Sequence, residues 1–354
     1  MSDLFTRSIE VIKENQHSSG AYLASPNFST YRYCWYRDGS FIAYAMNLIG
    51  EHENAARFHD WASSNVLSRV DIIQRALNKK LRNEILPSEE GLHTRYTLEG
   101  LDAEQDWPNF QLDGFGTWLW SLGEYQKLSG ATLKPIWVEA AQWTAKYLAA
   151  LWRQPCSDCW EEFPEQIHLN TLGSIYGGFQ GVSEILSGEF DNEAGKIHDY
   201  ILSNGIHNGY FMKYLGSKEV DASLIGLAVP YSVVSADHIN MKNTIEKIEQ
   251  DLQKQAGVHR YGKDTYYGGG EWILLTAWLG WYWAKLGNKE RALELYDWVV
   301  SQADGNGDLP EQVPNNLIKQ DYYEVWRKRW GEIANPLLWS HANFLILHHN
   351  LNLK

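Results

Sequence analysis

The chain has few cysteines, more acidic than basic residues and no long apolar run. Its three cysteines, Cys34, Cys156 and Cys159, form an odd, small set that argues against a disulfide framework and favours a reducing compartment. The net charge of −13 disfavours nucleic acid and anionic membranes as partners. No stretch approaches the length of a membrane span, and residues 1–16 resemble neither a signal peptide nor an anchor. We therefore expect a cytoplasmic protein with no membrane partner.

Common signatures of cofactor and nucleophile chemistry are absent as well. Cys156 and Cys159 form a C-x-x-C pair, but no second pair and no histidine follows at the spacing of a zinc site. The glycine-rich residues 260–270 lack the order of a phosphate-binding loop, and no dinucleotide fingerprint occurs. Ser340 and His341 suggest a nucleophile and a base, but the G-x-S-x-G elbow is missing. We expect neither a metal nor another cofactor.

Aromatic residues are abundant instead, with 17 Trp, 20 Tyr and 11 Phe. Such residues serve the core first. They also suit sugar binding, because the apolar face of a pyranose stacks on an aromatic ring while its hydroxyls seek polar partners.

Two kinds of helix alternate along the sequence. Residues 272–286 are apolar all round, as in a helix buried on every side, whereas 289–303 carry one apolar stripe. The same order occurs over 112–128 and 134–151. The glycines that follow apolar segments are Gly50, Gly130, Gly188 and Gly287. We predict an all-α fold, an (α/α)6 barrel of six helical hairpins in a single domain over 1–354, with a small β excursion near 210–234. An open α-solenoid is the competing architecture.

Two segments far apart in the sequence, 158–162 and 308–312, place carboxylates beside aromatic residues or proline. Hydrolysis of a glycosidic bond needs one protonated carboxyl to donate to the leaving oxygen and one ionised carboxyl to activate water or attack the sugar. Trp160 and Phe163 flank Glu161 and Glu162, and an apolar flank raises the pKa of a carboxyl, as a general acid requires. A solvated pair of glutamates is the plain alternative.

Two further segments each precede an apolar helix. Arg37 and Asp38 follow several aromatic residues, and such a pair suits sugar hydroxyls, although Asp38 is also well placed to cap the next helix. Asp113 is a similar candidate cap. Trp107, held by Pro108, suits a stacking platform, although a single Trp more often belongs to the core.

Taken together, these segments resemble the glucoamylase-type glycoside hydrolases of family 15. Six motifs carry the resemblance in order between Tyr31 and Ala342: Tyr-x-x-x-Trp-x-Arg-Asp, Trp-x-x-x-Gln-x-Asp-Gly, Trp-Glu-Glu, Arg-Tyr-x-x-Asp-x-Tyr-Tyr, Pro-Glu-Gln and Pro-Leu-x-Trp-Ser-His-Ala. The resemblance implies an (α/α)6 barrel that hydrolyses α-glucosides from the non-reducing end with inversion. Inversion in turn implies two carboxyl groups about 6.5–9.5 Å apart.

The resemblance also implies roles for individual residues. Glu161 would be the general acid, and Glu311 would be the general base that activates water. The residues that it places around the bound sugars are Tyr31, Trp35, Arg37, Asp38, Trp107, Trp160, Glu162, Arg260, Tyr267 and Trp339.

One departure from the family concerns the leaving-group side, where Pro108 and Asn109 replace the glycine and basic residue of starch-acting members. We therefore expect an inverting exo-acting α-glucosidase that releases β-glucose from short α-glucosides, with a preference for α-1,6 linkages as in isomaltose. Open alternatives are an α-1,4 glucoamylase or a trehalose hydrolase, and a non-catalytic sugar-binding protein. A sugar epimerase on an α/α barrel would instead use histidines as acid and base, and the candidates are His168, His238 and His341.

Overall fold

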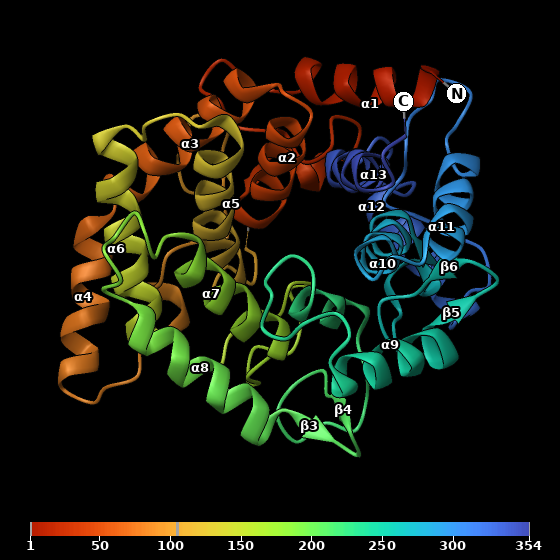
Figure 1. Cartoon of the computed structure of the whole chain (residues 1–354). Helices are drawn as coiled ribbons and strands as arrows, with labels where there is room; N and C mark the ends of the chain where they lie inside the picture. The colour runs from red at the N-terminus through yellow and green to blue at the C-terminus, as the bar shows by residue number, and fades with distance from the viewer. Residues whose placement is uncertain (1, 104–105, 354) are drawn as a thin grey trace.

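Helices in two concentric rings make up most of the molecule (Figure 1). The computed structural model describes residues 2–103 and 106–353, so the predicted domain ends, Met1 and Lys354, lie outside the described residues. The inner ring consists, in order, of α2 (Tyr36–Leu48), α5 (Asp113–Ser129), α7 (Leu169–Gly181), the short 3-10 helix η3 (Ala222–Leu227), α10 (Ile273–Lys285) and α13 (Leu338–Asn350). Each contacts the next, and α13 packs against α2, so the ring closes. The predicted (α/α)6 barrel is confirmed, and the open solenoid is wrong.

The outer ring covers the inner one and meets solvent. Its helices are α1 (Ser2–Glu14), α3 (His52–Leu67), α6 (Pro135–Leu151), α8 (Asp191–Asn204), α9 (Ile239–Leu252) and α11 (Lys289–Ser301). Helix α10 is buried along residues 273–282, whereas α11 buries only the stripe of Ala292, Leu295, Tyr296 and Val299. This difference is the one that the hydrophobic pattern predicts. Helix α4 (Val70–Leu81) packs outside α6.

The four glycines that follow the apolar segments all adopt the left-handed backbone region. Their φ angles are 91° at Gly50, 65° at Gly130, 73° at Gly188 and 87° at Gly287. A left-handed residue ends a helix by turning the chain away from its axis, and glycine adopts this region without steric strain. The turns between inner and outer helices therefore lie where the sequence predicts them.

The fourth inner element is short because its sequence cannot continue as a long helix. Pro230 follows η3 closely, and proline removes a backbone donor and disfavours helix in the residue before it. The β excursion predicted near 210–234 is reduced to β4 (Tyr210–Phe211), which pairs with β3 (Ile206–His207). Residues 222–227 are helical, so this part of the prediction is wrong.

The largest sheet was not predicted, because its strands are only two residues long. It joins β5 (Gln253–Lys254), β6 (Gly257–Val258), β7 (Glu271–Trp272) and β8 (Gln312–Val313) in antiparallel order. A smaller antiparallel pair joins β1 (Cys34–Trp35), directly before α2, to β2 (Arg95–Tyr96), which lies between α4 and α5 in the chain. At Gly270 an added Cβ would lie 2.4 Å from the carbonyl oxygen of Val313, so only glycine lets β7 and β8 approach each other there. Because β8 begins at Gln312, the sheet fixes the position of Glu311, the residue directly before it.

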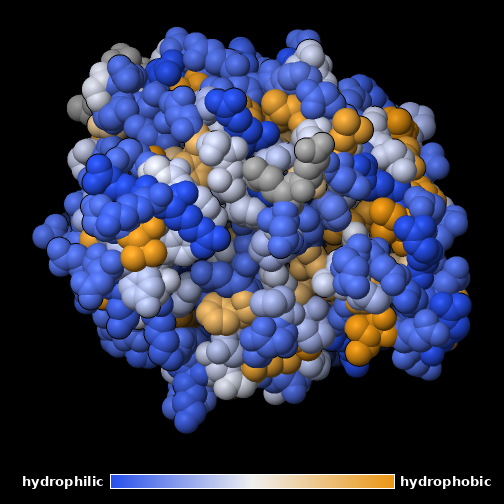
Figure 2. All heavy atoms as spheres, turned by 180° about the vertical axis from the view of Figure 1, so that it is seen from behind, coloured by the Kyte–Doolittle hydropathy of each residue, from blue (hydrophilic) through white to orange (hydrophobic). Residues whose placement is uncertain are grey.

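On the face shown in Figure 2, hydrophobic residues form separate small patches in a mainly hydrophilic surface. Within residues 2–103 and 106–353, no helix is long and apolar enough to cross a membrane.

Candidate functional site

A cavity of about 310 Å³ opens where the inner helices begin. Most of the segments around it precede α2, α5, α7, α10 and α13, so the N-terminal ends of these inner helices meet at one mouth of the barrel. The cavity is lined by Ala24, Tyr31, Trp35, Arg37, Asp38, Asp106, Trp107, Pro108, Cys159, Trp160, Glu161, Glu162, Arg260, Tyr266, Trp272, Glu311, Trp326, Arg329, Trp330, Leu337 and Trp339. Polar groups converging in an aromatic pocket are typical of a site for a small polar ligand.

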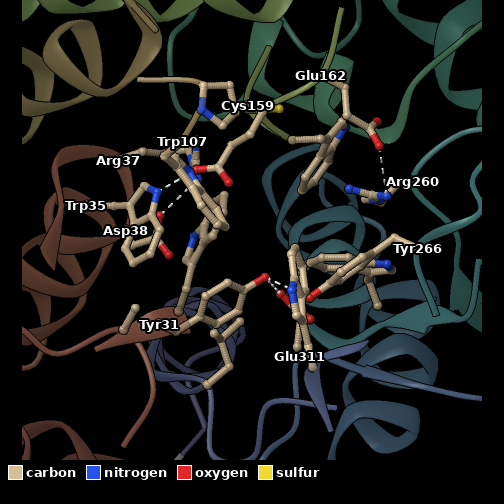
Figure 3. A pocket seen from close by; sticks show the side chains of 18 of the residues that line it. Tyr31, Trp35, Arg37, Asp38, Trp107, Cys159, Glu162, Arg260, Tyr266 and Glu311 are labelled. Atoms are coloured by element: carbon tan, nitrogen blue, oxygen red, sulfur yellow. Dashed lines mark hydrogen bonds and ion pairs between the residues drawn. The ribbon is translucent and has the colours of Figure 1, made fainter. Parts of the chain in front are cut away.

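Arg37 and Asp38 lie on one wall, at the start of α2 (Figure 3). The Arg37 guanidinium lies 3.2 Å from Asp38 and 3.4 Å from Asp113, and it also donates to the side chain of Gln111. The N-cap positions of α2 and α5 are Trp35 and Leu112, whereas Asp38 and Asp113 lie within the first helical turns, so both interpretations as N-caps are wrong. Burial raises the pKa of Asp38 to about 6, against the pull of Arg37. The pair presents a fork of donors and acceptors suited to sugar hydroxyls.

Glu311 lies on another wall, within a chain of hydroxyl groups (Figure 3). The Tyr31 hydroxyl donates to Glu311 Oε1 over 3.0 Å and lies 2.9 Å from the Tyr266 hydroxyl. The second oxygen, Oε2, has no hydrogen-bond partner among the described residues. Burial raises the pKa of Glu311 to about 8, although the two tyrosines and Arg260 oppose this shift. One carboxylate oxygen is therefore fixed by Tyr31, and the other has no hydrogen-bond partner among the described residues.

Glu161 projects from a tightly turned loop before α7. Its φ is +70°, a left-handed conformation that costs a non-glycine residue roughly 1–3 kcal/mol. The indole Nε1 of Trp35 donates to Glu161 Oε1 over 2.5 Å. Strain of this kind persists only where the surroundings enforce it, and it is common at functional sites.

Glu162 is fixed on the third wall. It accepts a hydrogen bond of 2.7 Å from the Tyr261 hydroxyl and lies 3.6 Å from Arg260, which is held by Asp264 at 2.8 and 2.5 Å. Burial raises the pKa of Glu162, while the Arg260 charge opposes the shift. Glu161 and Glu162 are each held by a hydrogen bond from an aromatic side chain, so the interpretation as a solvated pair is wrong.

The outer part of the cavity is aromatic. Trp107 lies parallel to Trp330, with ring centroids 6.1 Å apart and planes at 26°. The Arg95 guanidinium lies 3.8 Å from the centroid of the Trp107 ring, and the Trp35 ring meets Trp107 edge-on at 6.1 Å. Trp326, Arg329 and Trp330 belong to α12 (Tyr323–Trp330), an exposed helix that the sequence analysis missed. The two tryptophans four residues apart share one helix face, which was the available signal.

The structure brings together all the predicted site residues except one. Tyr267 does not line the cavity, and its hydroxyl donates to the carbonyl of Gly331. Its neighbour Tyr266 lies in the cavity instead. The other lining residues without a predicted role include Cys159, Trp272 and the three side chains of α12.

The histidines and Ser340 serve the framework. His341 is buried, accepts a hydrogen bond from the backbone N–H of Leu309, and has a pKa lowered to about 3 by burial. Ser340 donates to the carbonyl of Pro310, so both residues hold the loop that carries Glu311. His168 and His238 do not line the cavity. The geometry therefore gives no support to an epimerase that works through histidines.

The cysteines Cys34, Cys156 and Cys159 are free and buried. In the part of the chain that the structure describes, no group of His, Cys, Asp and Glu side chains is arranged to hold a metal ion.

Comparisons with known proteins agree with this architecture. An isomaltose glucohydrolase from Kribbella flavida is 40% identical, over 100% of this chain and 94% of that protein. A solved glycosidase variant in complex with glucose superposes with a TM-score of 0.96 at 39% identity, over 99% of this chain and 97% of that one. A glucoamylase from Saccharomycopsis fibuligera shares the fold, with a TM-score of 0.77 at 14% identity over 99% and 94% of the two chains.

A more distant relative is a trehalase from Sulfolobus acidocaldarius, 26% identical over 87% of this chain and 58% of that protein. The model of the glycosyl hydrolases family 15 matches residues 2–349. The chain belongs to this family and is a glycoside hydrolase.

Proposed function

We propose that the protein is an exo-acting α-glucosidase that releases β-glucose from short α-glucosides by inversion, with isomaltose-type α-1,6 substrates preferred. One observation carries the proposal: Glu161 and Glu311 come from opposite halves of the chain and line one aromatic cavity of about 310 Å³. The full-length similarity to an isomaltose glucohydrolase supports the choice of linkage.

In the proposed reaction, Glu161 donates its proton to the glycosidic oxygen while the bond from that oxygen to the anomeric carbon breaks. A water molecule attacks the anomeric carbon from the opposite face and passes a proton to Glu311 Oε2, the oxygen that has no partner among the described residues. Water is consumed, the leaving alcohol carries the proton from Glu161, and the glucose product has the β configuration. Arg37 and Asp38 bind the hydroxyls farthest from the cleaved bond.

The raised pKa of Glu311 conflicts with its role as a base. A carboxyl with a pKa of about 8 is largely protonated at neutral pH, which taken alone favours a general acid. Two observations support the base assignment instead. The Tyr31 hydroxyl donates to Oε1 and stabilises the ionised form, and Glu311 occupies the base position in the Pro-Glu-Gln motif of the family.

The mouth of the cavity favours a short substrate. Helix α12 lies over the leaving-group side and contributes Trp326 and Trp330, opposite Trp107. These rings suit stacking against one sugar ring of the leaving group. Maltose and trehalose remain the second candidates, and the similarity to a trehalase favours testing trehalose with them.

We also propose that the chain forms one catalytic domain, since the ring is completed only by contacts of α13 with α2 and α1. A cytoplasmic location is part of the same proposal, and the three buried free cysteines are compatible with a reducing compartment.

The first expected outcome concerns the product. Purified protein given isomaltose, maltose, kojibiose, nigerose or trehalose is expected to release glucose fastest from isomaltose. Proton NMR within minutes distinguishes the anomers before they equilibrate, and early β-glucose is expected because the reaction inverts the anomeric carbon. Early α-glucose would contradict inversion, and no release from any of the five sugars would contradict the substrate class.

A second expected outcome concerns the tyrosine chain. The Tyr31 hydroxyl donates its one proton to Glu311, so the Tyr266 hydroxyl donates to Tyr31 and both favour the ionised carboxylate. In Tyr266→Phe we expect a higher pKa for Glu311, and hence a shift of the acidic limb of kcat/KM to higher pH. The pH profile of kcat/KM measures this shift. Tyr267→Phe is the matched control, because that hydroxyl bonds to Gly331 outside the cavity. An acidic limb that does not move in Tyr266→Phe would refute the proposed coupling.

A further inference from the structure

Behind the loop that carries Glu161 lies a buried ion cluster that the reaction does not use directly. Its members are Lys213, Asp158 and Asp221, each no more than 3% exposed. The Lys213 ammonium lies 2.9 Å from Asp221 Oδ2 and 3.5 Å from Asp158 Oδ2. None of the three lines the cavity. A lysine taken so fully out of water requires compensation, because burial disfavours its charge.

Asp158 holds the loop from inside. Its Oδ1 accepts the backbone N–H groups of Trp160 and Glu162, each at 2.9 Å, and these residues stand on either side of Glu161. The backbone of Asp158 completes the turn, since its carbonyl accepts from the N–H of Glu161 and its N–H donates to the carbonyl of Glu162. One aspartate therefore fixes the backbone on both sides of a residue whose φ is +70°.

Asp221 holds the same loop through a side chain. Both of its oxygens lie 3.0 Å from the indole Nε1 of Trp160, and Oδ1 also accepts the N–H of Ser223 at the start of η3. Burial opposes the charged form, but Lys213 and the hydrogen bonds outweigh it and lower the pKa of Asp221. The loop is thereby tied to the inner ring of the barrel.

Lys213 lies where both carboxylates and an aromatic wall meet. Its ammonium is 3.3 Å from the centroid of the Tyr261 ring and 4.7 Å from that of Phe163. The Tyr261 hydroxyl donates to Glu162, and Phe163 is a second left-handed residue, with φ of +52°. A cation over two aromatic faces is stabilised by them, which helps to hold it away from water.

We propose that Lys213 is a positioning residue that, through Asp158 and Asp221, holds the strained 158–163 loop so that Glu161 points at the leaving oxygen. The proposal rests on the proposed role of Glu161 as general acid. Without the ammonium, two carboxylates lie buried side by side with no cation between them, and their repulsion acts on the hydrogen bonds that set the position of Glu161. Proton donation should suffer, whereas water activation by Glu311 on the other wall should not.

The test compares two kinds of substrate in Lys213→Met. Isomaltose has a poor leaving group and needs the general acid, whereas α-glucosyl fluoride has a leaving group that departs without strong acid assistance. We expect kcat on isomaltose to fall about 30-fold, less than the roughly 10²–10⁴-fold of a general acid that is removed outright, because Glu161 is still present, while kcat on α-glucosyl fluoride stays within about threefold. Equal losses on both substrates, or no loss on either, would overturn the proposal.

Controls separate positioning from folding. Phe179→Leu, in the core of α7 against Phe190, is the destabilised control, and its two activities should fall by the same factor. The double variant Lys213→Met/Asp221→Asn removes one of the two carboxylates that are left without a cation, and it should recover part of the isomaltose activity. If Lys213→Met alone does not fold, the activities on isomaltose and α-glucosyl fluoride are compared in this double variant instead. A wild-type protein that hydrolyses neither substrate would refute the proposed function itself, which is a different result from a variant that loses both activities.

Discussion

Glu311→Gln is expected to abolish hydrolysis, with kcat on isomaltose reduced at least about 10³-fold, or roughly 4 kcal/mol of transition-state stabilisation. The amide keeps the size of the side chain but cannot accept a proton from water. Steady-state glucose release measures the loss. The loss should be as large with α-glucosyl fluoride, because a good leaving group does not replace the base. Substantial activity with the fluoride would contradict the assignment.

The same variant should change the pH dependence of stability. The pKa of Glu311 is raised to about 8 in the folded protein, so the folded state binds a proton more tightly than the unfolded chain does. The stability that this group contributes is present below its unfolded pKa and is lost as pH rises through about 8. Glutamine removes this loss. The Tm of Glu311→Gln should therefore exceed that of the wild type more at pH 8 than at pH 4. An equal difference at both pH values would contradict the raised pKa.

Glu161→Gln is expected to lose about 10²–10⁴-fold in kcat on isomaltose, the usual contribution of a general acid. With α-glucosyl fluoride most of the activity should remain, because fluoride departs without that proton. Losses of equal size on the two substrates would contradict the role of Glu161 as general acid.

The two variants together decide between opposite role assignments. If Glu311→Gln keeps its activity on the fluoride and Glu161→Gln does not, Glu311 is the acid and Glu161 the base, as the raised pKa of Glu311 taken alone would favour. Our assignment requires the reverse pattern. Both outcomes are read from the same two substrates and require no structure of a complex.

The barrel could be predicted because hydrophobic periodicity reports burial directly. Residues 273–282 of α10 are buried all round and the stripe of α11 is buried on one side, as their sequences indicate. The two-residue strands β5 to β8 could not be predicted, because a pair of residues carries no period. The fourth inner element was missed for another reason: Pro230 limits η3 to a short 3-10 helix, and the sequence around it has neither a helical nor a strand pattern.

The site was predictable where a motif fixed both residue and neighbours, as in the segments around Arg37, Glu161 and Glu311. The prediction chose the wrong one of two adjacent tyrosines, because their placement depends on local backbone geometry. Tyr267 has φ of +47°, which turns its side chain toward Gly331 and leaves Tyr266 in the cavity. Helix α12 was missed because its tryptophans are only partly buried and line the cavity, so the helix has no fully buried stripe.

The order in which the chain is made has a consequence for this ring. The Ser8 hydroxyl of α1 lies 2.9 Å from His341 of α13, 333 positions later, and Ser340 of α13 supports the loop of Glu311. During synthesis α1 and α2 are made first, yet both pack against α13, the last of the inner helices. Until α13 is available, the ring of inner helices stays open and part of its apolar surface is uncovered. Closure of the ring and support of the Glu311 loop both depend on α13, so neither can be completed before this helix has been synthesised.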